Sequence, residues 1–210
     1  KIMDIKKIII SIIIGYALGM ISGGYFISKF VFKDDIRNYG SHNTGATNMQ
    51  RTYGNKYGFI TLFIDVLKGY LSVFLVNKLF GNNYGPIAGL AAVFGHNYPF
   101  YLKFKGGKGL ACTTGVLIAM TPKLLLILLV IFILTVLISK YVSLGAIVVS
   151  IVAPILAYFS KLYNGKIEFY TIIILALWII IRHHQNIDRL IKGNENKLSF
   201  SKKRGNKWLK

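Results

Sequence analysis

Long uncharged apolar stretches alternate with short polar segments along the whole chain. The first stretch, residues 8–28, carries no charged side chain. At a rise of about 1.5 Å per helical residue it is long enough to cross a hydrocarbon core about 30 Å thick. Six similar stretches follow, so the pattern predicts seven membrane spans, of which 110–120 and 169–181 are short for a full crossing. The others are 59–76, 84–101, 124–139 and 141–159.

The rest of the pattern predicts a single domain. Most polar connectors are only a few residues long, and the chain has no internal repeat, low-complexity tract or flexible linker. With 54% hydrophobic residues, the sequence is too apolar for an ordinary soluble domain. We therefore expect residues 1–210 to form one all-α integral membrane domain, a compact bundle of about seven transmembrane helices.

Lysine and arginine are unevenly divided among the connectors. If all seven stretches cross the membrane, most of these cations fall in the first, third and fifth connectors and in the tail from Arg182. The positive-inside rule then places those segments and the C-terminus in the cytoplasm and the N-terminus outside. Five spans would keep the first connector and the tail on one side, whereas six would separate them. The parity of the span count therefore matters more than the count itself.

The net charge of +19 would also suit a protein that binds nucleic acid. Nine of the cations, however, lie in the tail from Arg182, next to a membrane surface, so we expect them to contact anionic lipid headgroups and not nucleic acid. The single cysteine, Cys112, lies in an apolar run and excludes an internal disulfide. The histidines and the few acids form no pattern typical of a metal site, and we expect no metal.

Three polar segments carry residues suited to phosphate groups. They read IRNYGSHNTGATNMQR at 36–51, KFKGGKG at 103–109 and RHHQNIDRL at 182–190. Their glycines can expose backbone N–H groups, and their arginines and lysines supply cations and donors for phosphate oxygens. All three lie on the predicted cytoplasmic side, so the sequence predicts one composite site.

Two features lie within the predicted spans. Gly15, Gly19 and Gly23 share one helix face, which predicts close packing against another helix of the same chain, with a dimer interface as the alternative. Asp65 and Lys68 are three residues apart, about one helical turn, and predict an ion pair facing the bundle interior. That pair would act either as a structural clasp or as a support for the polar site.

Four segments, in order along the chain, resemble the motifs of a known family. GSHNTGATNMQRTYG, DVLKG, GHNYPFYLKFKGGKG and RHHQNIDRLIKGNE are similar to the motifs of the bacterial acyl-phosphate:glycerol-3-phosphate acyltransferases, the PlsY family. The resemblance covers nearly the whole chain. It implies a multi-pass enzyme of the bacterial cell (inner) membrane with seven spans and an active site facing the cytoplasm.

The resemblance also implies an activity. A fatty acyl group would pass from acyl phosphate to the 1-hydroxyl of glycerol 3-phosphate, giving lysophosphatidic acid and inorganic phosphate, at the first step of phospholipid synthesis. We expect no cofactor. The partners would be the two substrates and membrane lipids, and we expect a monomer.

Residues of this chain that match the family motifs give the expected site. Catalytic roles are expected for Ser41, Arg51, Lys108, His183 and Asn186, substrate binding for Asn43, Thr47, Asn48, Gly106, Gly107 and Gly109, and structural support for Asp65, Lys68 and Glu195. One departure is that the family typically reads Gly-Ser-Gly-Asn-Ile-Gly where this chain has His42 and Thr44. A positive φ at position 42 would penalise histidine, or His42 would add a phosphate donor.

The chemistry of an acyl phosphate leaves two alternatives for the proton. The donor is already activated, so holding the alcohol in line with the carbonyl can suffice. Either His183 acts as a general base or a substrate phosphate accepts the proton. The apolar donor also suggests a lateral groove between helices that opens to lipid near the polar segments.

Other functions are open to test. His183 and Asp188 have the His-x4-Asp spacing of acyltransferases that use acyl thioesters, but residues five apart lie apart on a continuous helix. A transporter of phosphate-like anions would show polar residues along several spans and inverted repeats, and we find neither. The segment KGGKGL lacks the full P-loop pattern of a kinase.

Overall fold

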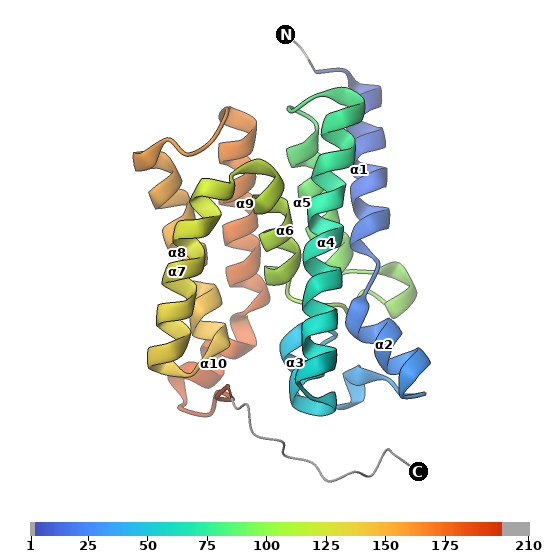
Figure 1. Cartoon of the computed structure of the whole chain (residues 1–210), viewed down its shortest axis with the longest axis vertical. Helices are drawn as coiled ribbons and strands as arrows, with labels where there is room; N and C mark the ends of the chain where they lie inside the picture. Colours follow the sequence, from blue (N-terminus) through green and yellow to red (C-terminus); the bar gives the residue numbers. More distant parts are fainter. Residues whose placement is uncertain (1–2, 199–210) are drawn as a thin grey trace.

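The computed structural model describes residues 3–198, and all regular secondary structure within them is helical (Figure 1). The α-helices are α1 (Ile5–Gly19), α2 (Gly23–Val31), α3 (Ala46–Tyr53), α4 (Asn55–Phe80), α5 (Gly85–Asn97), α6 (Leu110–Met120), α7 (Pro122–Ser139), α8 (Val142–Ser160), α9 (Lys166–Arg182) and α10 (His184–Ile191). Two short 3-10 helices, η1 (Ile36–Asn38) and η2 (Phe100–Leu102), lie in the connectors.

Each of the seven predicted apolar stretches is helical over most of its length, which confirms an all-helical membrane bundle. By length and composition, four segments of the described chain can cross a membrane, namely α1 with α2, α4, α7 and α8. A fifth, α9 with α10, is bent by 55°. Helices α5 and α6 have only 13 and 11 residues. The number of full crossings and the orientation in the membrane therefore stay predictions.

The sequence pattern predicted a single helix for the first stretch, but the structure has two. Helix α1 ends at Gly19 and α2 begins at Gly23. The side chain of Lys68, on α4, reaches this break, and its Nζ donates a hydrogen bond of 2.7 Å to the carbonyl oxygen of Ile21. A distant cation thus satisfies a carbonyl inside the break, which local sequence could not reveal.

Close packing between α1 and α5 confirms the prediction of intramolecular packing for Gly15 and Gly19, whereas Gly23 begins α2 and faces Ile64 of α4. A Cβ at Gly15 would lie 2.8 Å from the carbonyl carbon of Ala88, and one at Gly19 would lie 2.7 Å from that of Ala92. Neither glycine can carry a side chain without separating the helices, because atoms so close would overlap.

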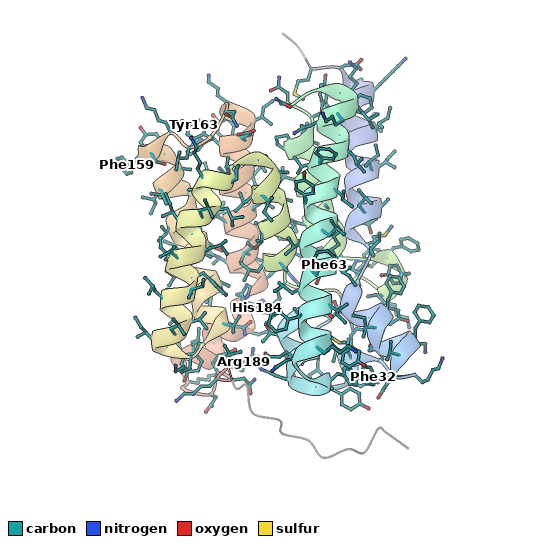
Figure 2. The ribbon with its side chains drawn as sticks, viewed as in Figure 1. Phe32, Phe63, Phe159, Tyr163, His184 and Arg189 are labelled. Carbon is teal, nitrogen blue, oxygen red and sulfur yellow. The ribbon has the colours of Figure 1, made fainter. Side chains whose placement is uncertain are left out.

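Two buried apolar clusters hold the bundle together. One joins α4, α5, α6 and α9 and includes Val73, Val93 and Val116; the other joins α6, α7, α8 and α9 and includes Leu124 and Ile172. Helix α4, which contributes to the first cluster, and helix α7, which contributes to the second, are separated from each other in the view of Figure 1. Many large apolar side chains face outward, such as Phe63 on α4, which is 66% exposed (Figure 2). Such a surface suits a lipid environment.

The polar segments lie near one end of the bundle. Helix α1 begins at the opposite end from α3 and α10 (Figure 1). The connector between α5 and α6 returns part-way along the bundle, because both of these helices are short (Figure 1). This arrangement brings the last part of the connector, residues 106–109, toward the interior, where Gly107 contacts Arg182 of α9.

Candidate active site

One cavity of about 750 Å³ joins the three polar segments to an apolar groove. Its apolar part is lined by side chains of α4, α6, α7, α8 and α9. Its polar part is lined by Ser41, Asn43, Thr47, Asn48, Arg51, Lys108, Gly109, His183, Asn186 and Glu195. The structure thus brings residues from all three segments together. Among the other predicted site residues, Asp65 also lines the cavity, whereas Lys68, Gly106 and Gly107 do not.

Asn48 organises the loop that carries Ser41. Its Oδ1 accepts a bond of 2.9 Å from the backbone N–H of Ser41, and its Nδ2 donates to the carbonyl oxygens of Tyr39 at 3.0 Å and Asn43 at 2.8 Å. The side chain is 2% exposed. Because both amide hydrogens are engaged within the loop, the geometry supports a bracing role for Asn48, and its contact with substrate stays a prediction.

Asn43 connects the first polar segment to the second. Its Oδ1 accepts a 2.8 Å bond from the N–H of Gly45, just before α3, and its Nδ2 donates to the carbonyl oxygen of Gly106 at 3.3 Å. Thr47 lies in the first turn of α3 and lines the cavity. The start of α3 is therefore fixed against the glycine loop, defined here as Gly106–Gly109.

The glycine loop is held from both sides. The N–H groups of Gly106 and Gly107 donate to the carbonyl oxygens of Asn97 and His96, at 3.1 and 3.0 Å. On the other side, Arg182 Nη2 donates to the carbonyl oxygen of Gly107 at 3.1 Å. Sequence reasoning missed this role of Arg182.

Gly106 and Gly107 serve packing, which differs from their predicted role in substrate binding. A Cβ at Gly107 would lie 2.5 Å from His96 Cε1 and closer still to Nε2, and one at Gly106 would lie 2.6 Å from Pro99 Cδ. Their N–H groups are already bonded to the end of α5. Gly109 differs from them, because it lines the cavity and has φ +95, a conformation that favours glycine.

Lys108 is the cation that the glycine loop presents to the cavity. Its Nζ donates to Asn186 Oδ1. Burial, together with the nearby charge of Arg189, lowers the pKa of Lys108 to about 8. The ammonium form therefore still predominates at pH 7, and a phosphate group beside Nζ would raise this pKa, because an opposite charge favours the charged form.

Glu195 anchors Asn186 and thereby Lys108. Its Oε1 accepts bonds from Asn186 Nδ2 at 2.9 Å and Ser143 Oγ at 3.1 Å, and its Oε2 accepts from Arg189 Nε at 2.7 Å. These contacts join α8, α10 and the segment after α10, as a structural brace would. They also place Asn186 in the correct amide orientation, with its oxygen toward Lys108.

Arg51 lies on α3, opposite the glycine loop. Its Nη2 donates to the carbonyl oxygen of Asn196 at 3.0 Å, and burial lowers its pKa from the ordinary value. Farther along this C-terminal segment, the N–H of Leu198 donates to the carbonyl oxygen of Lys140 at 2.7 Å. The segment therefore connects α3 to the turn between α7 and α8 and borders the cavity.

His183 is buried at the junction of α9 and α10. Its Nδ1 lies 2.8 Å from the carbonyl oxygen of Ile179, which can only accept, so Nδ1 carries the proton. Burial, with Lys108 nearby, lowers the pKa of His183 to about 4, and the ring is neutral at pH 7. Nε2 therefore offers a lone pair, which suits an acceptor for a hydroxyl proton better than a phosphate-binding cation.

A buried group of three charged or polar side chains lies behind the glycine loop. Lys68 Nζ is 2.8 Å from Asp65 Oδ1 and 2.7 Å from His96 Nδ1. The expected ion pair of Asp65 and Lys68 therefore forms in the interior and extends to a histidine that sequence reasoning left without a role. The only available signal was the position of His96 at the start of GHNYPFYLKFKGGKG.

The departure at His42 has a visible consequence. His42 has φ +54, a conformation that penalises any side chain with a Cβ. Its Nδ1 lies 2.9 Å from the carbonyl oxygen of Arg37, and the residue does not line the cavity. The geometry therefore supports the strained alternative and not an added phosphate donor.

Taken together, the fold and the cavity define an integral membrane protein whose site places cations at one end of a lipid-sized apolar groove. The family model for glycerol-3-phosphate acyltransferase matches residues 9–193. The chain belongs to this family.

Individual proteins that are similar to this chain carry the same family name. Glycerol-3-phosphate acyltransferases of Staphylococcus haemolyticus and Finegoldia magna are 41% and 46% identical, over 92% and 93% of this chain and 98% of each relative. The chain is also similar to the crystal structure of PlsY (YgiH), an integral membrane glycerol 3-phosphate acyltransferase. The glycerol 3-phosphate form of that structure gives a TM-score of 0.85 and 36% identity, over 91% of this chain and 96% of that one. Its lysophosphatidic acid form gives 0.83 and 35%, over 92% and 96%.

Proposed function

We propose that this protein transfers a fatty acyl group from an acyl phosphate to the 1-hydroxyl of glycerol 3-phosphate, releasing lysophosphatidic acid and inorganic phosphate. The observation that carries the proposal is the composite cavity, in which Arg51, Lys108 and His183 meet at the end of an apolar groove. A phosphorylated, water-soluble acceptor and a lipid-like donor need both environments side by side. Family membership supports the same acceptor.

The polar end suits two phosphorylated reactants. Their negative charges repel each other, so fixed cations and donors must hold them together. Arg51 and Lys108 approach from α3 and from the glycine loop, and Ser41 lines the same end. Arginine binds phosphate in a bidentate manner, whereas lysine acts as a point charge. The two residues therefore provide complementary contacts.

The transfer needs no protein nucleophile. The 1-hydroxyl oxygen attacks the carbonyl carbon of the acyl phosphate, the bond from that carbon to the phosphate oxygen breaks, and phosphate leaves with the electron pair. His183 Nε2 is available to accept the hydroxyl proton or to orient the hydroxyl, and the leaving phosphate can take that proton instead. Either path conserves the proton within the site.

The acyl chain would lie in the apolar groove. Side chains of α6, α7, α8 and α9 line it, among them Leu117, Phe132, Ala146 and Leu175. The groove extends along α8 from Ser143 to Ala153, ten residues or about 15 Å of helix. We place the enzyme in the bacterial cell membrane as a monomer, with the polar end facing the cytoplasm.

The test is acyl transfer from synthetic acyl phosphate to glycerol 3-phosphate by the purified protein in detergent. We expect lysophosphatidic acid and inorganic phosphate in equal amounts, and loss of about 100-fold in kcat/KM for Arg51→Ala, since a charge-assisted bond contributes up to about 3 kcal/mol. Transfer from acyl thioester alone would favour the thioester alternative. Substrate flux through proteoliposomes without transfer would favour a transporter.

A further inference from the structure

His96 lies in the wall of the cavity, outside the set of residues expected at the site. It is 3% exposed, at the end of α5, and lines the cavity together with Lys108 and Gly109. Its ring edge rests on Gly107, where any Cβ would overlap Cε1 and Nε2. The imidazole is thus placed at the point where the glycine loop meets α6.

The contacts of Lys68 determine which ring nitrogen carries the proton. Lys68 Nζ bonds to the carbonyl oxygen of Ile21 and to His96 Nδ1, both at 2.7 Å, and forms an ion pair of 2.8 Å with Asp65. An ammonium group can only donate. Nδ1 is 2.7 Å from Lys68 Nζ but 3.5 Å from Asp65 Oδ1, so it accepts from Lys68 in preference to donating to Asp65, and the proton lies on Nε2. The ring is a donor, and it is not arranged to act as a base.

That donor has no partner in the protein. Within residues 3–198, Nε2 makes no hydrogen bond, although the side chain is almost fully buried. Nδ1 faces Lys68, so the edge that lines the cavity is the Nε2 edge. Nε2 is therefore not sealed in the protein interior: it is reached from the cavity, where an oxygen of a bound ligand can accept its proton.

A second unpartnered group lines the same cavity. Thr113 Oγ1, in the first turn of α6, is buried without a hydrogen-bond partner. Helix α6 begins at Leu110, directly after Gly109, and the backbone N–H groups of its first turn have no partner within the helix. The acceptor that fits such a group of donors is an anionic oxygen.

We propose that His96 is a substrate-binding residue whose Nε2–H donates a hydrogen bond to a phosphoryl oxygen bound beside the glycine loop, with Asp65 and Lys68 fixing its tautomer. This proposal rests on the proposed function for the identity of the phosphorylated ligand. Acyl phosphate and glycerol 3-phosphate present the same oxygen chemistry, and the experiment below separates them.

Two amide substitutions separate the acceptor function of Nδ1 from the donor function of Nε2. His96→Asn keeps an acceptor near Nδ1 for Lys68 but removes the distal donor, whereas His96→Gln keeps an N–H donor near the position of Nε2. A purely structural ring would make the two variants equally harmful or place the larger defect in Gln. His184→Gln is the matched control, because His184 is exposed and does not line the cavity.

We expect His96→Asn to raise KM by about 10- to 100-fold for one phosphorylated substrate, as loss of a bond to a charged group implies. His96→Gln should recover most of this loss, and His184→Gln should match the wild type. The substrate whose KM changes is the one that supplies the oxygen. Unchanged KM values for both substrates in His96→Asn would overturn the proposal, as would equal loss of kcat in both variants with KM unchanged.

A spectroscopic measurement keeps the test independent of folding in the variants and of turnover. In wild-type protein labelled with ¹⁵N-histidine, the four histidines can be followed individually. We expect His96 to show the Nε2–H tautomer and its Nε2 resonance to shift when glycerol 3-phosphate or inorganic phosphate is added. An Nδ1–H tautomer, or no shift with either anion at saturation, would refute the proposal. Absence of acyl transfer by wild type would refute the proposed function alone.

Discussion

The contact between the glycine loop and His96 predicts a specific effect of adding one methyl group. In Gly107→Ala, the new Cβ would lie 2.5 Å from Cε1 and 2.8 Å from Cδ2 of His96, whereas ordinary contacts lie at 3.4–4 Å. Nε2 would lie closer still, so the ring or the loop must move by more than about 1 Å. The ring is held by Lys68, whose Nζ is itself bound to Ile21 and paired with Asp65.

The loop is the other element that could move, and it too is bonded. Moving it weakens the bond from the Gly107 N–H to His96 and the bond from Arg182 to the Gly107 carbonyl. Overpacking of this kind costs about 1–3 kcal/mol, and each weakened bond about 1 kcal/mol. At about 2–4 °C per kcal/mol, a cost of about 1–3 kcal/mol lowers Tm by about 2–12 °C. Because Lys108 is adjacent, kcat/KM should fall by at least about 10-fold as well.

The assay pairs thermal unfolding in detergent with acyl-transfer kinetics. Gly115→Ala is the matched control, because its Cβ would lie 2.7 Å from the backbone nitrogen of Tyr70, between α4 and α6, and Gly115 does not line the cavity. It should lower Tm similarly while leaving KM unchanged. If Gly107→Ala keeps both the wild-type Tm and the wild-type kcat/KM, the contact is not rigid and the reasoning is wrong.

Four further predictions follow from the same geometry. The pKa of Lys108 is about 8, so kcat/KM should fall above about pH 8 as the ammonium loses its proton, and Lys108→Arg should move this fall to higher pH in a pH–rate profile. Glu195→Gln removes the charge that holds Arg189 and disturbs the orientation of Asn186, so kcat/KM should fall by about 10-fold, whereas an unchanged value would exclude a bracing role. Ala153→Phe fills the far end of the groove, so long-chain acyl phosphates should lose activity while short-chain donors keep it, measured with a chain-length series. His42→Gly relieves a φ of +54 outside the cavity and should change kcat/KM by less than about twofold, without lowering Tm.

The helices were largely predictable from sequence, and the exceptions have a tertiary cause. Uncharged apolar runs form helices wherever they occur, because a helix satisfies its own backbone in lipid. The break at residues 20–22 was not predictable, since Lys68, which binds Ile21, lies 47 residues away. The shortness of the helix in 84–101 was not predictable either: α5 ends at Asn97, where the chain turns back into the glycine loop.

The site was predictable as far as its residues lie in polar segments. Ser41, Arg51, Lys108 and His183 stand out there, and the structure brings them into one cavity. Buried side chains behind the cavity wall were harder to recognise as site residues from the sequence. His96 lies in an apolar stretch, and its role depends on its contact with Lys68, 28 residues earlier in the chain. Whether Asn48 faces a ligand or the loop likewise depends on its bonds and not on its residue type.

The charges at the polar end explain why the site needs its ligands. Lys68 and Asp65 neutralise each other in the interior. Around Lys108, the cations Arg51, Arg182 and Arg189 lie near the carboxylate of Glu195, which is already paired with Arg189. The lowered pKa of Lys108 is the direct consequence of burial beside these cations. Two phosphorylated substrates would supply the missing negative charge. Binding of the first should therefore raise the pKa of Lys108, and that added proton would in turn favour binding of the second.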